Sequence, residues 1–268
     1  MLTKNDIINQ LALMGGRRDG VVIVHSSLRS VGQIEGGGEA LLDALIEYFT
    51  SDGGLLCVPT HTWANVGIEG KITLDMANPE SHLGALSSIA LSDSRGLLTE
   101  NPTHSMVIFG DRARAERLAA DEGELLTPTA PKSSYGKLYD LSGSVLLIGV
   151  SQSSNTYIHA LDEILGVFDR MSDERLTVTV KRSTGEVVER EWYLYDESEG
   201  DLSYRFPKLD TAFRYHGAIR DGFIGRAPAQ LCDAVAMKKA LELIYKNSGG
   251  KDPFADELPI PPSLYCNE

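Results

Sequence analysis

The stretch Ser144–Glu163, with the sequence SVLLIGVSQSSNTYIHALDE, joins a short apolar run to a polar corner and the start of a helix. The apolar run lies between Gly143 and Gly149 and is typical of a strand buried on both faces. Side-chain oxygens at residues 153–155 could cap the first turn of the helix. Ligands in open α/β sheets bind at such strand-to-helix corners, so we expect a functional site here.

The helix that follows carries His159, Asp162 and Glu163. Spacings of three and four residues place both carboxylates on the helical face of the histidine. Either carboxylate could hold one ring nitrogen and leave the other free as a base, with a pKa raised above its usual value of about 6.5. The alternative interpretation is a half-buried histidine that a neighbouring acid satisfies.

The rest of the chain alternates buried strands with amphipathic helices as far as residue 165. This alternation predicts an α/β fold, in three α/β/α layers with a central mixed sheet. Helices are expected at residues 3–13, 39–49, 84–91 and 229–245, and strands at 21–25, 54–59 and 106–109. Residues 64–81 have no clear period and are expected to form a long loop.

An antiparallel hairpin is predicted near residues 175–195, because residues 176–180 and 187–195 alternate apolar and polar side chains around a turn. Asp221-Gly222 suggests a second hairpin. The run Asp196–Asp201 contains four acids in six residues. It could be a solvated loop or a rim that attracts a cationic substrate.

The chain has 268 residues, enough for one large domain. We expect a single domain over residues 1–268, with a hairpin-rich insertion at about residues 170–200. No apolar run approaches the roughly 18 residues that span a bilayer, and no secretory signal is visible at the N-terminus. The sequence therefore predicts a cytoplasmic protein without a membrane partner, and a homodimer is the default assembly.

The net charge of -13 argues against nucleic-acid binding, which needs a basic surface, and is compatible with a cationic small substrate. Cys57, Cys232 and Cys266 are far apart and odd in number. This pattern predicts reduced thiols rather than a zinc or redox site.

Histidines and hydroxyls gather at the expected strand ends: His25, His61, His104 and His159 each stand near serines or threonines. If these strands are neighbours, the side chains converge at one edge of the sheet. A metal hydrolase is one reading, but no His-x-His or His-x-x-x-His pair is present, and we expect no metal.

A serine acyl hydrolase is an alternative, because Ser151 lies between strand and helix much as a nucleophile elbow does. Its triad would need Asp210 and His216.

Several motifs together resemble the aminoglycoside 3-N-acetyltransferase family, in order and spacing, over roughly residues 20–165. They are HSSLRSVG (25–32) followed by Gly37-Gly38, VPTHT (58–62), NPTHS (101–105), SYGKL (134–138), and LLIG (146–149) with NTYIH (155–159). GFIGRA (222–227) also looks like the family's C-terminal part.

The resemblance implies transfer of an acetyl group from acetyl-coenzyme A to an amine. It implies that His159 is the catalytic base, with Asp162 where the family usually has glutamate. It also implies that the cosubstrate contacts the strand-end corners, at Ser26, Ser27, Leu28, Thr60, Thr62, His104, Ser105 and Ser134. A protonated amine must lose a proton before it attacks a thioester, so a base suits this chemistry. Cys57 has no neighbouring base, which favours direct transfer.

The sequence departs from the family pattern at Gln152-Ser153, where a pair ending in aspartate is common, and at Asn101, where histidine is common. The resemblance therefore leaves the acceptor open among aminoglycosides, amino sugars and other amines. A homologue that binds ligand without catalysis is a third alternative.

Overall fold

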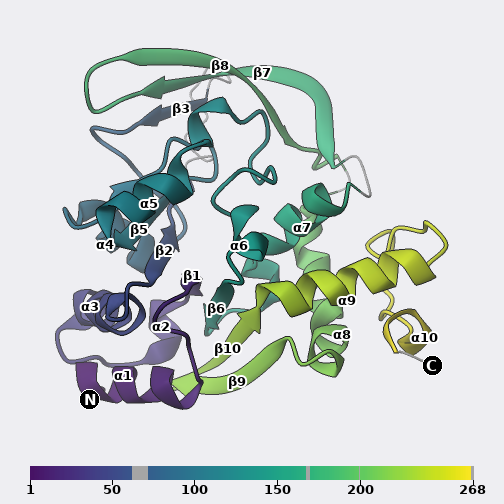
Figure 1. Cartoon of the computed structure of the whole chain (residues 1–268), viewed down its shortest axis with the longest axis horizontal. Coiled ribbons are helices and arrows are strands. Elements are labelled where there is room, and N and C mark those ends of the chain that lie inside the picture. The colour runs from purple at the N-terminus through teal and green to yellow at the C-terminus, as the bar shows by residue number, and fades with distance from the viewer. Residues whose placement is uncertain (62–71, 167–169, 199, 267–268) are drawn as a thin grey trace.

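The computed structural model describes residues 1–61, 72–166, 170–198 and 200–266. The described chain forms a mixed seven-stranded sheet and a separate three-stranded sheet (Figure 1). From edge to edge, the strands of the large sheet are β4 (Leu97–Leu98), β5 (Met106–Gly110), β2 (Leu55–Pro59), β1 (Val21–Ser26), β6 (Ser144–Ile148), β10 (Ala227–Asp233) and β9 (Ile219–Ile224). β1 runs parallel to β2 and β6, and the other pairings are antiparallel.

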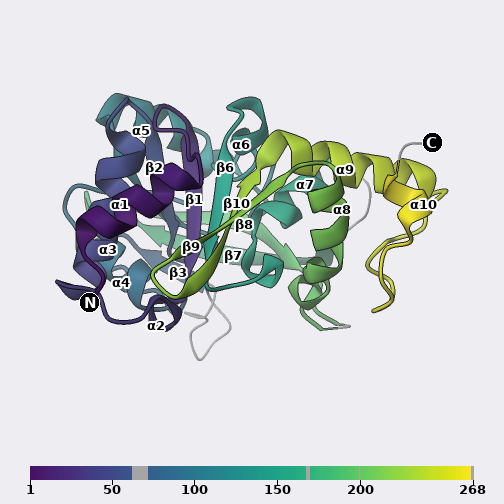
Figure 2. The same ribbon diagram turned by 90° about the horizontal axis from the view of Figure 1, so that it is seen from below.

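Helices cover both faces of the large sheet, because alternate strand residues point to opposite sides. Val22 and Val24 of β1 pack toward α1 (Lys4–Leu13), α2 (Leu28–Val31), α3 (Gly37–Thr50) and α4 (Ala85–Ser92). Val21 and Ile23 pack on the other side, toward α5 (Arg112–Ala119), α6 (Lys137–Asp140), α7 (Tyr157–Leu165), α8 (Asp210–Tyr215), α9 (Ala234–Asn247) and α10 (Pro262–Tyr265). Figure 2 shows α1 and α3 on one side of the sheet and α8 and α9 on the other. The predicted three-layer α/β/α fold is confirmed.

The small sheet consists of β3 (Ile72–Asp75), β7 (Met171–Lys181) and β8 (Val187–Tyr195). β7 and β8 form the predicted antiparallel hairpin, which arches over the top of the molecule in Figure 1. Trp192 is fully buried in a small core with Ile72 and Val178. Its indole Nε1 donates to Thr103 Oγ1 at 3.2 Å, which ties the small sheet to the segment before β5.

Three short 3₁₀ helices complete the described chain: η1 (Glu122–Glu124), η2 (Gln152–Ser154) and η3 (Leu202–Leu209). At the N-terminus, Thr3 and Asp6 form a capping box at the start of α1. In the described residues, no helix has both the length and the apolar character needed to cross a bilayer.

Four local predictions were wrong. β3 lies within the expected loop at residues 64–81, and the last long helix begins at Ala234 because β10 occupies the residues before it. Asp221-Gly222 lies inside β9, and the chain turns instead at Gly225, whose φ of 59° suits glycine. Residues 153–155 do not cap α7, whose N-cap residue makes no side-chain cap bond; Ser151 caps η2 instead.

Candidate active site

The strand pairing explains why the polar corners meet. β1, β2 and β6 run in parallel, so their carboxyl ends lie at one edge of the sheet. β5 is antiparallel to β2, with Met106 opposite Pro59, so the residues that precede β5 reach the same edge. His25, Ser26, His61, His104 and His159 all line one cavity there, of about 1020 Å³. The predicted convergence of histidines is confirmed.

Segments distant in the sequence complete the cavity wall. They are the residue before β7, the end of β8, the following loop with η3, and part of the C-terminal segment. Their lining residues include Arg170, Leu194, Tyr195, Asp196, Glu197, Asp201, Arg205, Phe206, Asp252 and Phe254. Because Asp196, Glu197 and Asp201 belong to the acidic run, that run is part of the cavity wall.

Aromatic rings form a continuous row along the cavity. The His61 and His104 ring centroids are 4.3 Å apart. Tyr195 meets His104 edge-on at 5.6 Å and stacks on His159 at 4.3 Å with 24° between the ring planes. The ring centroids of Phe206 and His159 are 4.7 Å apart, in a T-shaped contact. The row therefore links the ends of β2, β8 and α7.

Some polar atoms of the site are paired and others are not. His61 Nε2 lies 2.8 Å from the Tyr135 hydroxyl, and His104 Nδ1 lies 3.0 Å from Thr103 Oγ1. Within the described residues, His25 Nε2, Ser26 Oγ and His159 Nδ1 are buried without a hydrogen-bond partner. Buried polar atoms in native proteins are normally satisfied, so these atoms are suited to bind a ligand.

The four cavity histidines are neutral at pH 7, because burial disfavours the charged imidazole. Burial lowers the pKa of His25 to about 4 and that of His104 to about 3, and it takes the pKa of His61 well below its usual value. Burial lowers the pKa of His159 to about 4, with Asp201 opposing the shift and Arg170 adding to it. The expected upward shift at His159 was wrong.

The carboxylates of α7 have partners other than the histidine. Asp162 is 1 % exposed; it accepts a hydrogen bond from Arg170 Nε at 3.1 Å and another from the Tyr245 hydroxyl. Glu163 accepts from Thr127 Oγ1 at 2.5 Å and from Thr129 Oγ1 at 2.6 Å. No hydrogen bond joins either carboxylate to His159 in the part of the chain that the structure describes.

Of the residues expected to contact the cosubstrate, Ser26 and His104 line the cavity. Thr60 and Ser105 are fully buried and bond each other at 2.9 Å. The backbone N–H of Ser134 donates to Glu122 at 2.7 Å.

Two more of these residues lie at the start of α2, whose N-cap is Ser27. Ser27 Oγ accepts from Ser30 Oγ at 2.9 Å, and Leu28 packs against the core of the N-terminal helices. Thr62 lies outside the described residues.

The two departures from the family pattern have structural partners. Asn101 is fully buried, donates to Glu122 at 3.0 Å and accepts from the backbone N–H of His104 at 2.8 Å. Gln152 is also buried and donates to Gln230 at 3.0 Å. Ser153 alone of these three residues lines the cavity.

The residues proposed for a serine hydrolase are not assembled into a triad. Ser151 Oγ lies 2.8 Å from Ser153 Oγ. Asp210 accepts from Arg214 at 2.6 Å, and His216 Nε2 lies 2.7 Å from the carbonyl oxygen of Tyr265. The structure therefore gives no support to Ser151 as an activated nucleophile.

Cys57 is fully buried in β2, where burial raises the pKa of its thiol. Its thiolate is therefore disfavoured at neutral pH. Among the residues that the structure describes, no three or more side chains of His, Cys, Asp or Glu are grouped to hold a metal ion.

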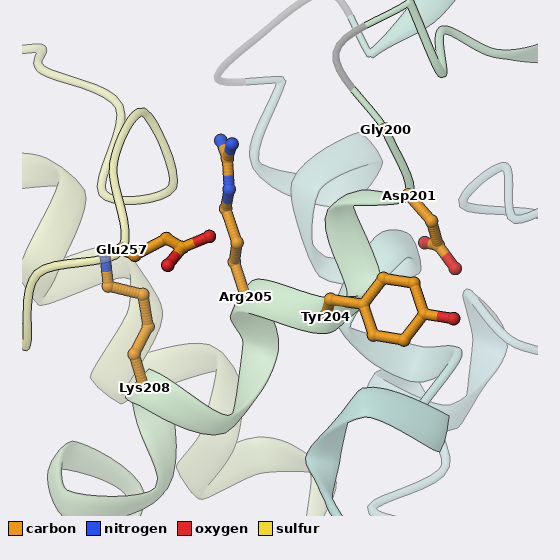
Figure 3. A pocket seen from close by; sticks show the side chains of 6 residues that line it. All are labelled: Gly200, Asp201, Tyr204, Arg205, Lys208 and Glu257. Atoms are coloured by element: carbon orange, nitrogen blue, oxygen red, sulfur yellow. The ribbon is translucent and has the colours of Figure 1, made fainter.

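A second pocket, of about 440 Å³, adjoins the cavity and shares Gly200, Asp201 and Arg205 with it. In the view of Figure 3, the side chains of Lys208 and Glu257 lie on one side of Arg205, and those of Asp201 and Tyr204 lie on its other side. Both charge signs occur here, so an elongated polar ligand could extend from the cavity into this pocket.

Sequence reasoning missed the cavity-lining residues Arg170, Tyr195, Phe206 and Asp252. Their side chains come from segments that show hairpin, loop or helix patterns, and no local motif marks them. The acidic run was the one signal in this region.

The chain matches the family model described as aminoglycoside 3-N-acetyltransferase over residues 23–244. It is 29% identical over 234 residues to aminoglycoside N(3)-acetyltransferase IV from Salmonella sp, which covers 85% of this chain and 81% of the relative.

Solved structures show the same fold. A histidine-to-alanine mutant of aminoglycoside acetyltransferase AAC(3)-IVa in complex with apramycin has a TM-score of 0.74 and 25% identity, covering 99% of this chain and 97% of that chain. The AAC-IIIb binary complex with CoASH has a TM-score of 0.75 and 22% identity, covering 91% and 96%.

Proposed function

Because the chain belongs to the aminoglycoside 3-N-acetyltransferase family, whose members are acyltransferases, we propose that it transfers an acetyl group from acetyl-coenzyme A to an amine of an aminoglycoside or a related amino sugar. The observation that carries this proposal is the cavity at the sheet edge, where a neutral histidine on α7 faces the same space as an acidic loop. The coenzyme A and apramycin complexes of structural neighbours support it.

The cavity fits the proposed reactants. Its volume of about 1020 Å³ is at the upper end of the range for small-molecule sites and can admit both a thioester arm and an amino sugar. Asp196, Glu197 and Asp201 can attract a polycationic acceptor to the cavity. The unpartnered His25 Nε2 and Ser26 Oγ can donate hydrogen bonds to a thioester carbonyl oxygen.

His159 is the proposed general base. Burial holds its pKa near 4, so the imidazole is neutral at pH 7 and has a free nitrogen lone pair for the proton that leaves the attacking amine. The amine nitrogen then forms a bond to the acetyl carbon, and the bond between that carbon and the coenzyme A sulfur breaks. The proton passes to the departing thiolate, so the products are an amide and free coenzyme A.

Direct transfer in a ternary complex is the proposed route. Cys57 is buried in a strand and does not line the cavity, so it is poorly placed to carry the acetyl group. Cys57, Cys232 and Cys266 are all free thiols, which accords with the reducing cytoplasm as the proposed location. A homodimer is the assembly we expect.

Thiol release tests the proposal. The protein with acetyl-coenzyme A should release coenzyme A when an aminoglycoside or amino sugar is added, and more slowly with a polyamine that lacks the sugar framework. Prior chelation should leave the rate unchanged. Calorimetry should show coenzyme A binding without an acceptor.

Two results would contradict the proposal. Coenzyme A binding without thiol release for any amine favours a non-catalytic homologue. If the protein cleaves esters and Ser151→Ala abolishes this activity, the serine acyl hydrolase is the correct function.

A further inference from the structure

The imidazole of His159 is held by rings rather than by a carboxylate. Its Nδ1 has no hydrogen-bond partner in the described chain, although two acids follow it on the same helix. The face of the imidazole lies against Tyr195, with 4.3 Å between centroids and 24° between planes. Phe206 contacts it at 4.7 Å in a T-shaped arrangement. Ring contacts therefore set the plane of this imidazole.

Tyr195 is itself held by a chain of hydrogen bonds. Thr129 presents its backbone N–H and its Oγ1 to Glu163 Oε1, at 3.1 and 2.6 Å, and Thr127 Oγ1 lies 2.5 Å from Glu163 Oε2. The Tyr195 hydroxyl also contacts Thr129 Oγ1. A threonine hydroxyl has one proton, and an ionised glutamate only accepts. Thr129 thus donates to Glu163 and accepts from Tyr195.

The position of Tyr195 in the fold joins the small sheet to the site. It is the last residue of β8, it lines the cavity, and its other side meets the ring of His104 edge-on at 5.6 Å. The tyrosine thus contacts two imidazoles, one from the segment before β5 and one from α7. Its neighbour Tyr193 instead bonds Arg175 on an exposed part of the hairpin, at 2.5 Å.

We propose that Tyr195 is a positioning residue for the His159 imidazole, and that Glu163 fixes Tyr195 through Thr129. This inference rests on the proposed role of His159 as the base. A base gains its catalytic effect only when its lone pair points at the proton to be removed. A stacked ring limits the imidazole to rotation within one plane. The hydrogen bonds from Glu163 through Thr129 to Tyr195 fix where that plane lies.

The first experiment measures ring geometry in the substrate-free protein. In histidine-labelled protein, the ring proton signals of His159 are identified by their loss in His159→Asn. A tyrosine face stacked on the imidazole should shift these signals upfield. The shift should persist in Tyr195→Phe, which keeps the ring, and disappear in Tyr195→Leu. The matched control Tyr193→Leu removes a ring from the same strand and should leave the signals unchanged.

The second experiment separates kcat from KM. Tyr195→Leu should lower kcat by about 10-fold to 10²-fold, the loss expected when a catalytic group is displaced by about 1 Å. KM for acetyl-coenzyme A should change by less than about 3-fold, because the cosubstrate contacts are kept. Glu163→Gln should lower kcat by a smaller factor in the same direction. Tyr193→Leu should match the wild type in both constants.

The outcomes are separable from those of the proposed function. If the wild type shows no transfer to any amine, the proposed function fails. The signals of the free protein still report whether Tyr195 orients the His159 imidazole. A folded Tyr195→Leu protein whose His159 signals keep the upfield shift, or whose kcat equals that of the wild type, overturns the inference. If Tyr195→Leu does not fold, Glu163→Gln decides, and a wild-type kcat in that variant overturns it.

Discussion

At the scale of single residues, the sequence predicts the position of His159 on its helix but not the side chains that contact it. Helical spacing places Asp162 and Glu163 near the histidine, yet each carboxylate bonds other groups. A carboxylate on a helix can rotate toward any donor that the surrounding elements supply. Here those donors are Arg170 and the threonines before α6, and His159 is left among aromatic rings.

Replacing the base should separate chemistry from binding. His159→Asn should lower kcat by about 10²-fold to 10⁴-fold, the usual effect of losing general-base help, while the affinity for coenzyme A stays within a few-fold. Steady-state kinetics and calorimetry measure the two effects. In the wild type, the acidic limb of kcat/KM should lie near pH 4, because burial lowers the pKa of His159 to about 4. A limb near pH 6.5 would show that the free enzyme exposes this ring to water.

At the scale of elements, a cluster of buried and half-buried charged groups ties four segments together. Asp162 of α7 accepts from Arg170, and Arg170 also makes a two-pronged contact with Asp252 at 2.7 and 2.9 Å. Tyr245 of α9 donates to Asp162 from the other side. The cluster thus joins α7, the residue before β7, α9 and the C-terminal segment.

Breaking this cluster should reduce stability more than turnover. Asp162→Asn keeps the shape of the side chain but removes a buried charge that faces Arg170. We expect a loss of about 1 to 3 kcal/mol in the free energy of unfolding, measured by urea denaturation. Asp252→Asn is the control and should cost less, because that side chain is 23% exposed. The folded Asp162→Asn protein should keep the kcat of the wild type, and a loss as large as that of His159→Asn would show that Asp162 orients the base.

The hairpin of β7 and β8 shows the same contrast between local and distant information. The alternation of apolar and polar residues predicts its two strands, because each strand has one solvent-exposed face. The side chain of Tyr193 points to an arginine on the exposed hairpin, whereas Tyr195, two residues later, is part of the cavity wall. The register of β7 shifts between Met171 and Arg175, the residues that pair with Tyr195 and Tyr193, and the strand pattern does not show this shift.

At the scale of the whole molecule, the fold gathers four neutral histidines at one sheet edge, of which three are buried and His159 is partly exposed. His25, His104 and His159 have pKa values lowered to about 4, 3 and 4, and the pKa of His61 is also lowered. In an unfolded chain each would titrate near 6.5. Between these values the unfolded state binds more protons than the folded state, so folding is favoured above about pH 6.5 and weakened as the pH falls toward 4.

We therefore expect the free energy of unfolding to fall on acidification from pH 7 to pH 5. Each histidine contributes a slope of up to about 1.4 kcal/mol per pH unit within this window. Burial raises the pKa of Glu122, Asp162 and Glu163, and these groups oppose part of the effect. The cleanest measurement compares urea denaturation of the wild type with that of His25→Asn. In this variant the free energy of unfolding should depend less steeply on pH, because one fewer proton is taken up on unfolding. Equal slopes would contradict a buried neutral His25.

The sequence by itself determined most strands and helices of the first 165 residues, the strand-end corners and the histidine on α7, because hydrophobic periodicity and short motifs are local properties of the chain. The tertiary structure decided which polar groups meet. Strand order and the antiparallel entry of β5 bring His104 to the end of β2, and the hairpin and C-terminal segment close the cavity with Tyr195 and Asp252. Partner choice among buried polar groups depends on contacts between segments far apart in the chain, and those contacts exist only after the chain has folded.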